Sequence, residues 1–374
     1  MLPRLTLLQA KRSTRSLSTS SGAVQRLLEK KPKDVVVTFA KRTAMGRAKK
    51  GQLKDTPVDE LLQALFKATL KETKLDPAKI EDICVGTCHP PSPLYVSRAA
   101  ALAASIPAEV PISTVNRLCA SGLQAIRSIA HGIESGAISL GMAVGVESMS
   151  LNPRPTPEVV DAVKAHVQAA DCIQVGTRIQ SIARTLIHLG SQPMGWTSEM
   201  VAVSYDVSRE KQDQYALISH TRAERASDSG IFAEEIIPIE LRGSVVSVDD
   251  TIRKGVTAES LSKLKPAFEW GKQSTTAGNA SGVGDGAGIC ILTTRERADA
   301  EGWGILGKYV ASTFVGVEPR YMGISPVAAI PKILAQTGLA KEDIDIYEIN
   351  EAFASQFAYC VEQLQVPMEK VNPK

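Results

Sequence analysis

Aromatic side chains are scarce in this chain of 374 residues, at 5% of the total, although 44% of its residues are hydrophobic. We therefore expect a core of aliphatic side chains packed between helices and a sheet. No apolar run approaches the roughly 18 residues that a membrane-spanning helix needs. These features predict a soluble α/β protein with no membrane span.

The body of the chain also lacks an excess of positive charge. The net charge is +3, but eight of the 43 basic residues lie within residues 1–33 and only one acid, Glu29, lies there. The rest of the chain has 35 basic and 39 acidic residues, a net charge of −4. Nothing in the body therefore indicates a nucleic-acid partner.

Residues 1–30 form a separate leader in this interpretation. They are rich in Arg, Ser and Thr and almost free of acids, which is typical of a mitochondrial transit peptide and not of folded structure. A plain disordered tail is the alternative.

The chain has six cysteines, at positions 84, 88, 119, 172, 290 and 360, but no secretory signal. We therefore expect free thiols rather than disulfides. Cys84, Cys88 and His89 are close together in sequence, yet no second ligand pair follows them. Zinc binding is accordingly not expected, and the sequence predicts no metal site.

Strands and helices alternate through the first half, which predicts a parallel sheet covered on both faces. A buried strand at 34–42 precedes a helix with Thr56 as N-cap, Pro57 at its first position and Asp59 completing a capping box. Further strands are expected at 81–88 and 138–148. In a second half from residue 303 we expect strands at 305–317 and 344–350 and helices at 325–339 and 351–364.

Cys119 stands where a β-branched stretch ends and an amphipathic helix begins, so we expect its thiol on the first helical turn. The N–H groups and dipole of that turn favour a thiolate over a thiol. A buried, structural cysteine is the alternative. Asn350 ends the strand expected at 344–350, where its amide can orient a water molecule or an oxyanion, or can simply cap the next helix.

A glycine-rich run, TAGNASGVGDGAG, leads into an expected strand at 289–292. A dinucleotide-binding fingerprint has the reverse order, with the strand before the glycines. We therefore reject nicotinamide binding and expect a loop that lets the backbone approach a ligand closely.

The motifs VNRLCASGLQAI, GVESMS, IRKGVTAESLSKLKPAF, TAGNASGVGDGAG and NEAFASQFA together resemble the thiolase family, in particular its members that cleave 3-ketoacyl-CoA in fatty-acid β-oxidation. The resemblance implies two βαβαβαββ halves in five layers, with a loop domain inserted in the first half. It also implies an acyltransferase that forms homodimers or homotetramers and uses acyl-CoA and coenzyme A as substrates, without a cofactor.

The resemblance further implies roles for individual residues. Cys119 is the nucleophile, Asn350 holds a water in the oxyanion hole, and Phe353 lines the pocket. Met194 and Ser281 face pantetheine, and Arg253 and Ser260 lie near the nucleotide of coenzyme A.

Two departures from the family pattern affect these expectations. The family has a later histidine and a second cysteine as acid/base groups, whereas no histidine follows His220 here and Cys360 stands in a helical context. Because each such group contributes about 10²- to 10⁴-fold, we expect the chain as written, with an incomplete second half, to be inactive or very weakly active and poorly soluble alone. Residues 175–192 also look inserted; a gene-model error is the stronger interpretation and an amphipathic partner or membrane-surface helix the weaker one.

The expected domains are the leader (1–30), an N-terminal thiolase domain (31–295) with a loop domain at 152–265, and a C-terminal domain (303–374). The leader favours the mitochondrial matrix, with the peroxisome as the alternative. A non-catalytic remnant that binds acyl-CoA or pairs with another subunit is the alternative function, and an acetoacetyl-CoA thiolase is the nearest enzymatic one.

Overall fold

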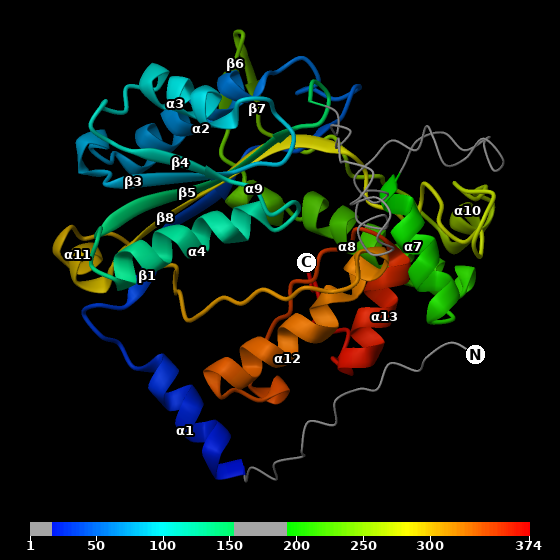
Figure 1. Ribbon diagram of the computed structural model, residues 1–374. Helices are drawn as coiled ribbons and strands as arrows, with labels where there is room; N and C mark the ends of the chain where they lie inside the picture. Colours follow the sequence, from blue (N-terminus) through cyan, green and yellow to red (C-terminus); the bar gives the residue numbers. More distant parts are fainter. Residues whose placement is uncertain (1–16, 153–192) are drawn as a thin grey trace, which may run out of the picture.

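The computed structural model describes residues 17–152 and 193–374 and shows a mixed sheet between two helical layers (Figure 1). The seven-stranded sheet has the order β4-β3-β5-β8-β1-β9, with β2 paired to β8. Its strands are β1 (Val35–Arg42), β2 (Gly46–Arg47), β3 (Asp82–Gly86), β4 (Ile112–Val115), β5 (Leu140–Ser148), β8 (Gly284–Thr294) and β9 (Gly307–Lys308). A hairpin of β6 (Ile239–Leu241) and β7 (Ser244–Val246) stands apart.

Helices cover both faces of the sheet, as the alternation predicted. They are α1 (Leu17–Leu28), α2 (Val58–Thr73), α3 (Pro93–Ala103), α4 (Ser121–Glu134), α7 (Pro193–Ser204), α8 (Arg209–Asp228), α9 (Ile231–Glu235), α10 (Ala258–Ser262), α11 (Arg295–Ala300), α12 (Ser325–Thr337) and α13 (Ala354–Leu364). Helices α2 and α3 lie on one face and α4 on the other (Figure 1). Neighbouring side chains of β3 divide accordingly: Ile83 and Val85 join the core under α2, and Cys84 joins the core under α4.

Only part of the sheet is parallel. β3 pairs in parallel with β4 and β5, whereas β8 runs antiparallel to both β5 and β1. The parallel part matters for the site, because the carboxyl ends of β3, β4 and β5 meet at one edge, where ligands of such sheets bind.

Helix α2 forms where expected, but its cap differs. The N-cap is Pro57, without a side-chain hydrogen bond, so the capping box with Thr56 and Asp59 is wrong. Thr56 is instead buried, and its carbonyl accepts a hydrogen bond from Ser148 at the end of β5. The apolar stripe, including Leu61, packs into the core as predicted.

Part of the leader is folded, contrary to expectation. Residues Leu17–Leu28 form helix α1, in which Ala23 is buried close to Gly338 at the end of α12. Just after the helix, the carbonyl of Glu29 accepts a hydrogen bond from Lys308 Nζ. The second half of the helix is thus attached to the body.

The second half departs most from the predicted strands. Of the strand expected at 305–317, only Gly307–Lys308 pairs, with β1; the strand expected at 344–350 is reduced to one bridge between Tyr347 and Val371. Helices α12 and α13 form as predicted, although α13 begins at Ala354. In the described part of the second half these helices therefore pack without a sheet of their own.

The glycine-rich run is also divided differently. Gly284, Gly286 and Gly288 belong to β8, which is 11 residues long, instead of to a loop. The loop proper ends at Val283. The inserted stretch 175–192 and the first part of the loop domain lie outside the described residues.

Candidate active site

Cys119 lies in the turn that joins β4 to α4, at the edge where the parallel strands end. Its thiol is exposed. Helix α4 begins at Ser121 with Ala120 as N-cap, so Cys119 directly precedes the cap, and its placement on the first helical turn is wrong. The reason is local: Leu118 has a left-handed backbone (φ 48°), which turns the chain before the helix can start.

Two polar side chains hold this strained turn. Asn116 Oδ1 accepts a hydrogen bond from the backbone N–H of Leu118 at 2.9 Å. Ser121 Oγ accepts one from the N–H of Arg117 at 2.8 Å and donates to the carbonyl of Leu118 at 2.6 Å. A left-handed residue without glycine persists only where its surroundings determine it in this way. The sequence NRLCAS thus fixes the direction in which the thiol is presented.

The loop after β3 lies beside this turn and contains Cys88 and His89. Glu147 Oε2 accepts a hydrogen bond from the N–H of Cys88 at 2.9 Å, and Glu147 Oε1 accepts one from the N–H of His89 at 3.2 Å. Cys84 lies within the sheet core instead of beside Cys88. The described residues contain no cluster of three or more metal-binding side chains. Sequence reasoning gave Glu147 no role, although it lies in the motif GVESMS and stands as an acid at the end of a buried strand.

Ser281 and Phe353 are brought together by two backbone hydrogen bonds. The N–H of Ser281 donates to the carbonyl of Ala352 at 3.0 Å, and the N–H of Ala354 donates to the carbonyl of Asn279 at 2.9 Å. Phe353 is buried and Ser281 is exposed. The run at 279–281 and the start of α13 therefore form one wall, although more than 70 residues separate them in sequence.

A buried polar network supports this wall from behind. Glu199 of α7 is fully buried, and its Oε1 accepts hydrogen bonds from the N–H groups of Ser274 at 3.1 Å and Thr275 at 2.7 Å. Ser198 Oγ bonds to both Thr275 Oγ1 and Ser355 Oγ. Helices α7 and α13 are thereby joined to the 274–281 run through hydroxyl groups.

We expect Glu199→Gln to lower the free energy of unfolding by about 1 to 2 kcal/mol, because a neutral amide is a weaker acceptor for two buried N–H groups. Urea unfolding followed by circular dichroism measures this. The control is Glu259→Gln, since Glu259 is exposed and forms only a surface ion pair with Lys263; its expected change is within about 0.5 kcal/mol. Equal changes in both variants would contradict the role of the network.

Of the residues expected near coenzyme A, Ser281 belongs to this run and Arg253 contacts it. Arg253 Nη1 donates to the carbonyl of Ala277 at 3.0 Å and is exposed. Ser260 is exposed as well, but its hydroxyl takes part in the capping box of α10 with Thr257. Met194, at the start of α7, is half-buried. His220, which sequence reasoning did not select, bonds through Nε2 to the carbonyl of Gly278 at 2.9 Å.

Asn350 occupies a different hollow, of about 400 Å³. It is exposed, and its backbone carbonyl accepts a hydrogen bond from Gln356 Nε2 at 2.9 Å. Arg222, Glu348 and Lys374 also line this hollow. Cys119 is not among the residues that line this hollow, and the expected oxyanion role of Asn350 stays a prediction.

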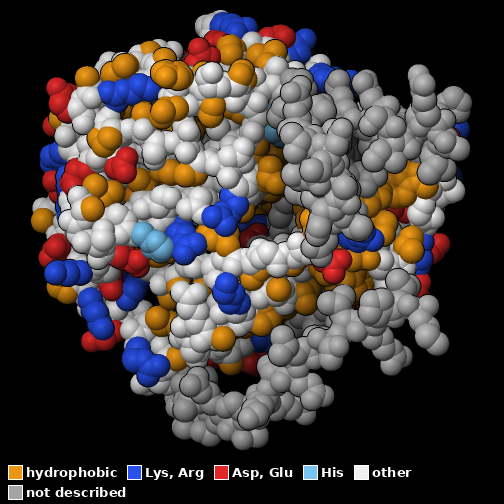
Figure 2. Space-filling model, viewed as in Figure 1, with side chains coloured by type: hydrophobic (Ala, Val, Ile, Leu, Met, Phe, Trp, Pro, Cys, Tyr) orange, Lys and Arg blue, Asp and Glu red, His pale blue; other side chains and the backbone are white. Residues whose placement is uncertain are grey.

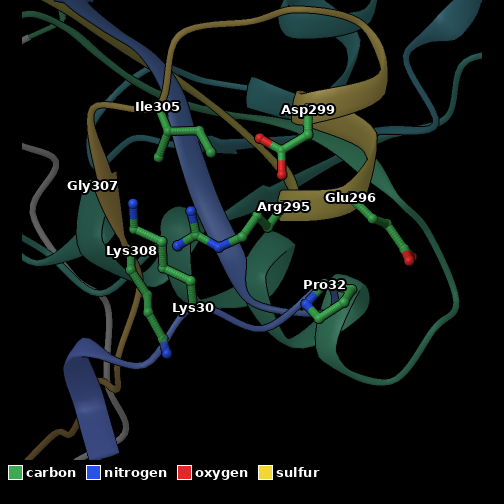
Figure 3. Close-up of a pocket in the computed structure, with 8 residues that line it drawn as sticks. All are labelled: Lys30, Pro32, Arg295, Glu296, Asp299, Ile305, Gly307 and Lys308. Atoms are coloured by element: carbon green, nitrogen blue, oxygen red, sulfur yellow. The ribbon is translucent and has the colours of Figure 1, made fainter. Parts of the chain in front are cut away.

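The larger hollow, of about 660 Å³, lies elsewhere, between the segment after α1 and the start of α11 (Figure 3). Lys30, Arg295 and Lys308 line it, but Lys308 and Arg295 both bond to buried Asp34. Burial disfavours the charged carboxylate, yet the bonds from Lys308 and Arg295 outweigh it and lower the pKa of Asp34. Figure 3 shows Glu296 turned away from the other side chains. Glu296 and Asp299 line the hollow as well, so together with Asp34 three acids balance its three cations, and the hollow offers no excess positive charge for an anion.

Basic and hydrophobic side chains gather along the middle of the face seen in Figure 2. The guanidinium groups of Arg117 and Arg127 both lie over the ring of Phe314, at 4.1 and 5.1 Å from its centroid. This contact ties the extended segment after β9 to α4 and to the residue two positions before Cys119. The second half thus touches the turn that presents the thiol.

Comparison with known proteins gives the family context of this geometry. Residues 35–296 match the model of the thiolase N-terminal domain, and residues 304–374 match that of the thiolase C-terminal domain. A human relative, 3-ketoacyl-CoA thiolase, peroxisomal, is 46% identical over 351 residues, which are 91% of this chain and 78% of that protein.

Solved structures agree. The dimeric peroxisomal thiolase of Saccharomyces cerevisiae has a TM-score of 0.85 and 39% identity, covering 93% of this chain and 87% of that one. Human mitochondrial 3-ketoacyl-CoA thiolase in complex with CoA has a TM-score of 0.75 and 33% identity, covering 91% and 84%. The five-layered fold implied by the motifs is confirmed as the fold of these relatives.

Proposed function

Because this chain belongs to the thiolase family and is thereby an acyltransferase, we propose that it cleaves 3-ketoacyl-CoA with coenzyme A through an acyl-cysteine at Cys119. The observation that carries this is the exposed thiol in a fixed turn at the ends of three parallel strands. The identity to the human 3-ketoacyl-CoA thiolase supports the choice of substrate.

The covalent route divides the reaction into two transfers. The sulfur of Cys119 attacks the 3-keto carbon, and the bond between carbons 2 and 3 breaks. The leaving fragment takes up a proton and departs as acetyl-CoA. The thiol of coenzyme A then attacks the acyl-cysteine, which releases an acyl-CoA two carbons shorter and restores the thiol of Cys119.

The substrate would lie along the wall formed by the 279–281 run and the start of α13. Ser281 and Met194 would contact pantetheine, and Phe353 would exclude water from the acyl group. Arg253 is exposed at the far end of the same run, where its charge would attract a phosphate of coenzyme A. In this arrangement coenzyme A is a substrate and no resident cofactor is required.

Mixing the protein with a 3-ketoacyl-CoA and separating the CoA esters by chromatography tests the proposal. We expect one equivalent of acetyl-CoA per active chain, together with an acylated protein. Weak turnover stays a prediction. It is measured by adding coenzyme A and following how fast the shortened acyl-CoA is released. The proposed activity would be contradicted if no 3-ketoacyl-CoA of four to sixteen carbons gave either acetyl-CoA or an acylated chain.

We further propose a homodimer that forms through β4. This strand ends the sheet, so one of its edges is unpaired, and Tyr95 of the adjoining helix α3 is 79% exposed. Tyr95→Asp is expected to give a monomer in light scattering, since it places a charge in the contact. Val245→Asp, at a position on β7 that is 64% exposed, should leave a dimer. A monomeric parent protein, or a dimeric Tyr95→Asp, would contradict this interface.

The peroxisome is the proposed compartment. The relatives named above include a human and a yeast peroxisomal thiolase, which favours the alternative over the mitochondrial matrix that the leader suggested. Helix α1 also weakens the transit-peptide interpretation, because its second half contacts the body. None of the described helices is long and apolar enough to cross a membrane.

A further inference from the structure

Two cysteines lie in neighbouring loops at the edge of the sheet, and the proposed reaction uses only one of them. Cys88 leaves β3 in the loop beside the Cys119 turn, and its Sγ lies 3.7 Å from Ser121 Oγ, two residues beyond Cys119. The charge of Cys119 is close enough to Cys88 to raise its pKa. Cys88 has no role in acyl transfer as derived above.

The backbone brings the two loops together. The pairing of β3 with β4 continues past its last residue through a hydrogen bond from the N–H of Thr87 to the carbonyl of Val115 at 3.1 Å. Asn116 Nδ2 then donates to the carbonyl of Cys88 at 3.1 Å. These two hydrogen bonds hold the loop of Cys88 against the segment that runs from Val115 into the Cys119 turn.

The two sulfur atoms differ in environment. Cys119 is exposed, so a dissolved oxidant reaches it directly. Cys88 is half-buried; burial, followed by the charges of Glu147 and Cys119, raises its pKa to about 11, and a hydrogen bond with Ser121 only partly offsets this. Cys88 therefore remains a thiol at neutral pH and is protected from direct oxidation.

We propose that Cys88 is the resolving thiol for Cys119 and closes a reversible disulfide with it when a hydroperoxide oxidises Cys119. The sulfur of Cys119 attacks the peroxide, the O–O bond breaks, and a sulfenic acid and one water or alcohol form. The sulfur of Cys88 then attacks the sulfenic sulfur, the S–O bond breaks, and the proton of Cys88 leaves with hydroxide as water. Two electrons pass from the two thiols to the peroxide, and a dithiol returns them.

The loop can accommodate this change. Residues 87–92 have no regular secondary structure, and the hydrogen bond between Cys88 and Ser121 is the contact that must break. Closing the disulfide would stop acyl uptake while protecting Cys119 from irreversible oxidation. That effect on acyl uptake rests on the proposed function, whereas the disulfide itself rests only on the geometry.

Peptide mapping after treatment with one equivalent of hydrogen peroxide tests the proposal. Trypsin releases Cys88 in residues 80–98 and Cys119 in residues 118–127. After alkylation of free thiols, we expect these two peptides to be linked, with a loss of about 2 Da relative to the thiols. Tris(2-carboxyethyl)phosphine should separate them again.

The matched controls are two cysteine-to-serine variants in the same peptide. Cys88→Ser should form no link. With one equivalent of peroxide its Cys119 should stop at the sulfenic acid, about 16 Da heavier, and only a second equivalent should convert it to the sulfinic acid, about 32 Da heavier than the thiol. Cys84→Ser should keep the link, because Cys84 is buried in the sheet. A link from Cys119 to any cysteine other than Cys88, or sulfinic acid formed equally fast with and without Cys88, would overturn the proposal.

Failure of the proposed function would look different. If Cys119 takes up no acyl group but still forms the link, the disulfide proposal is supported and the proposed acyl transfer is contradicted. If Cys88→Ser keeps acyl uptake and the parent protein forms no link, the proposed acyl transfer is supported and the resolving role of Cys88 is contradicted.

Discussion

Replacing Cys119 with serine is expected to abolish acyl uptake. After incubation with acetyl-CoA, the parent protein should gain about 42 Da, one acetyl group for one proton, and Cys119→Ser should gain nothing. The reason is that a serine hydroxyl is a far poorer nucleophile than a thiolate at neutral pH unless a base activates it. We expect the rate of acyl transfer to fall by about 10³- to 10⁶-fold.

The control for this substitution is Cys290→Ser. Cys290 lies in β8, and burial raises the pKa of its thiol, which makes it unreactive. The variant Cys290→Ser should therefore take up as much acetyl as the parent protein. An adduct that survives in Cys119→Ser, or that disappears in Cys290→Ser, would show that another group carries the acyl chain.

Adding a side chain to Gly86 is expected to displace the start of α4 and with it the turn that holds Cys119. A Cβ atom at Gly86 would lie 2.3 Å from the carbonyl oxygen of Ser121, and backbone cannot move aside as a flexible side chain can. We expect Gly86→Val to lower the free energy of unfolding by about 3 kcal/mol. Urea unfolding measures this loss.

Acyl uptake should fall further than stability alone explains. Without urea, most Gly86→Val molecules remain folded. In these molecules the acetyl adduct should decrease at least about tenfold, because moving the thiol of Cys119 by about 1 Å lowers the rate of an oriented reaction by that much or more. Mass spectrometry of the folded fraction, isolated by size-exclusion chromatography, measures it.

Gly122→Ala supplies the matched control, one residue inside α4. No atom lies within 4 Å of a Cβ built there, so the added methyl group meets open space. Alanine also favours the helix over glycine, and we expect a gain of up to about 1 kcal/mol in the free energy of unfolding. Equal behaviour of the Gly86 and Gly122 variants would contradict the close approach of β3 to α4.

Gly86 and the start of α4 matter both for acyl transfer at Cys119 and for the proposed disulfide. The close contact between Gly86 and Ser121 brings the β3 exit next to the nucleophile turn, and Cys88 follows Gly86 by two residues. A glycine that permits this contact is therefore a condition both for presenting Cys119 and for placing a second thiol beside it.

The sequence by itself determined the family, the fold and the position of Cys119 at a strand-to-helix junction. It could do so because the signals are local: a β-branched run, a small-residue turn, an amphipathic helix and motifs of fixed spacing. The buried strand at 35–42 and helices α2, α12 and α13 followed from the same kind of periodicity.

Only the tertiary structure decided what lies around the thiol. Leu118 takes a left-handed backbone because Asn116 and Ser121 bind the turn from both sides, and propensity does not contain that information. Glu147, on strand β5, accepts a hydrogen bond from the N–H of Cys88, about 60 residues away in sequence. Glu199, on helix α7, accepts one from the N–H of Ser274. The strand expected at 344–350 failed for the same reason, since a strand needs a partner edge and local pattern cannot supply one.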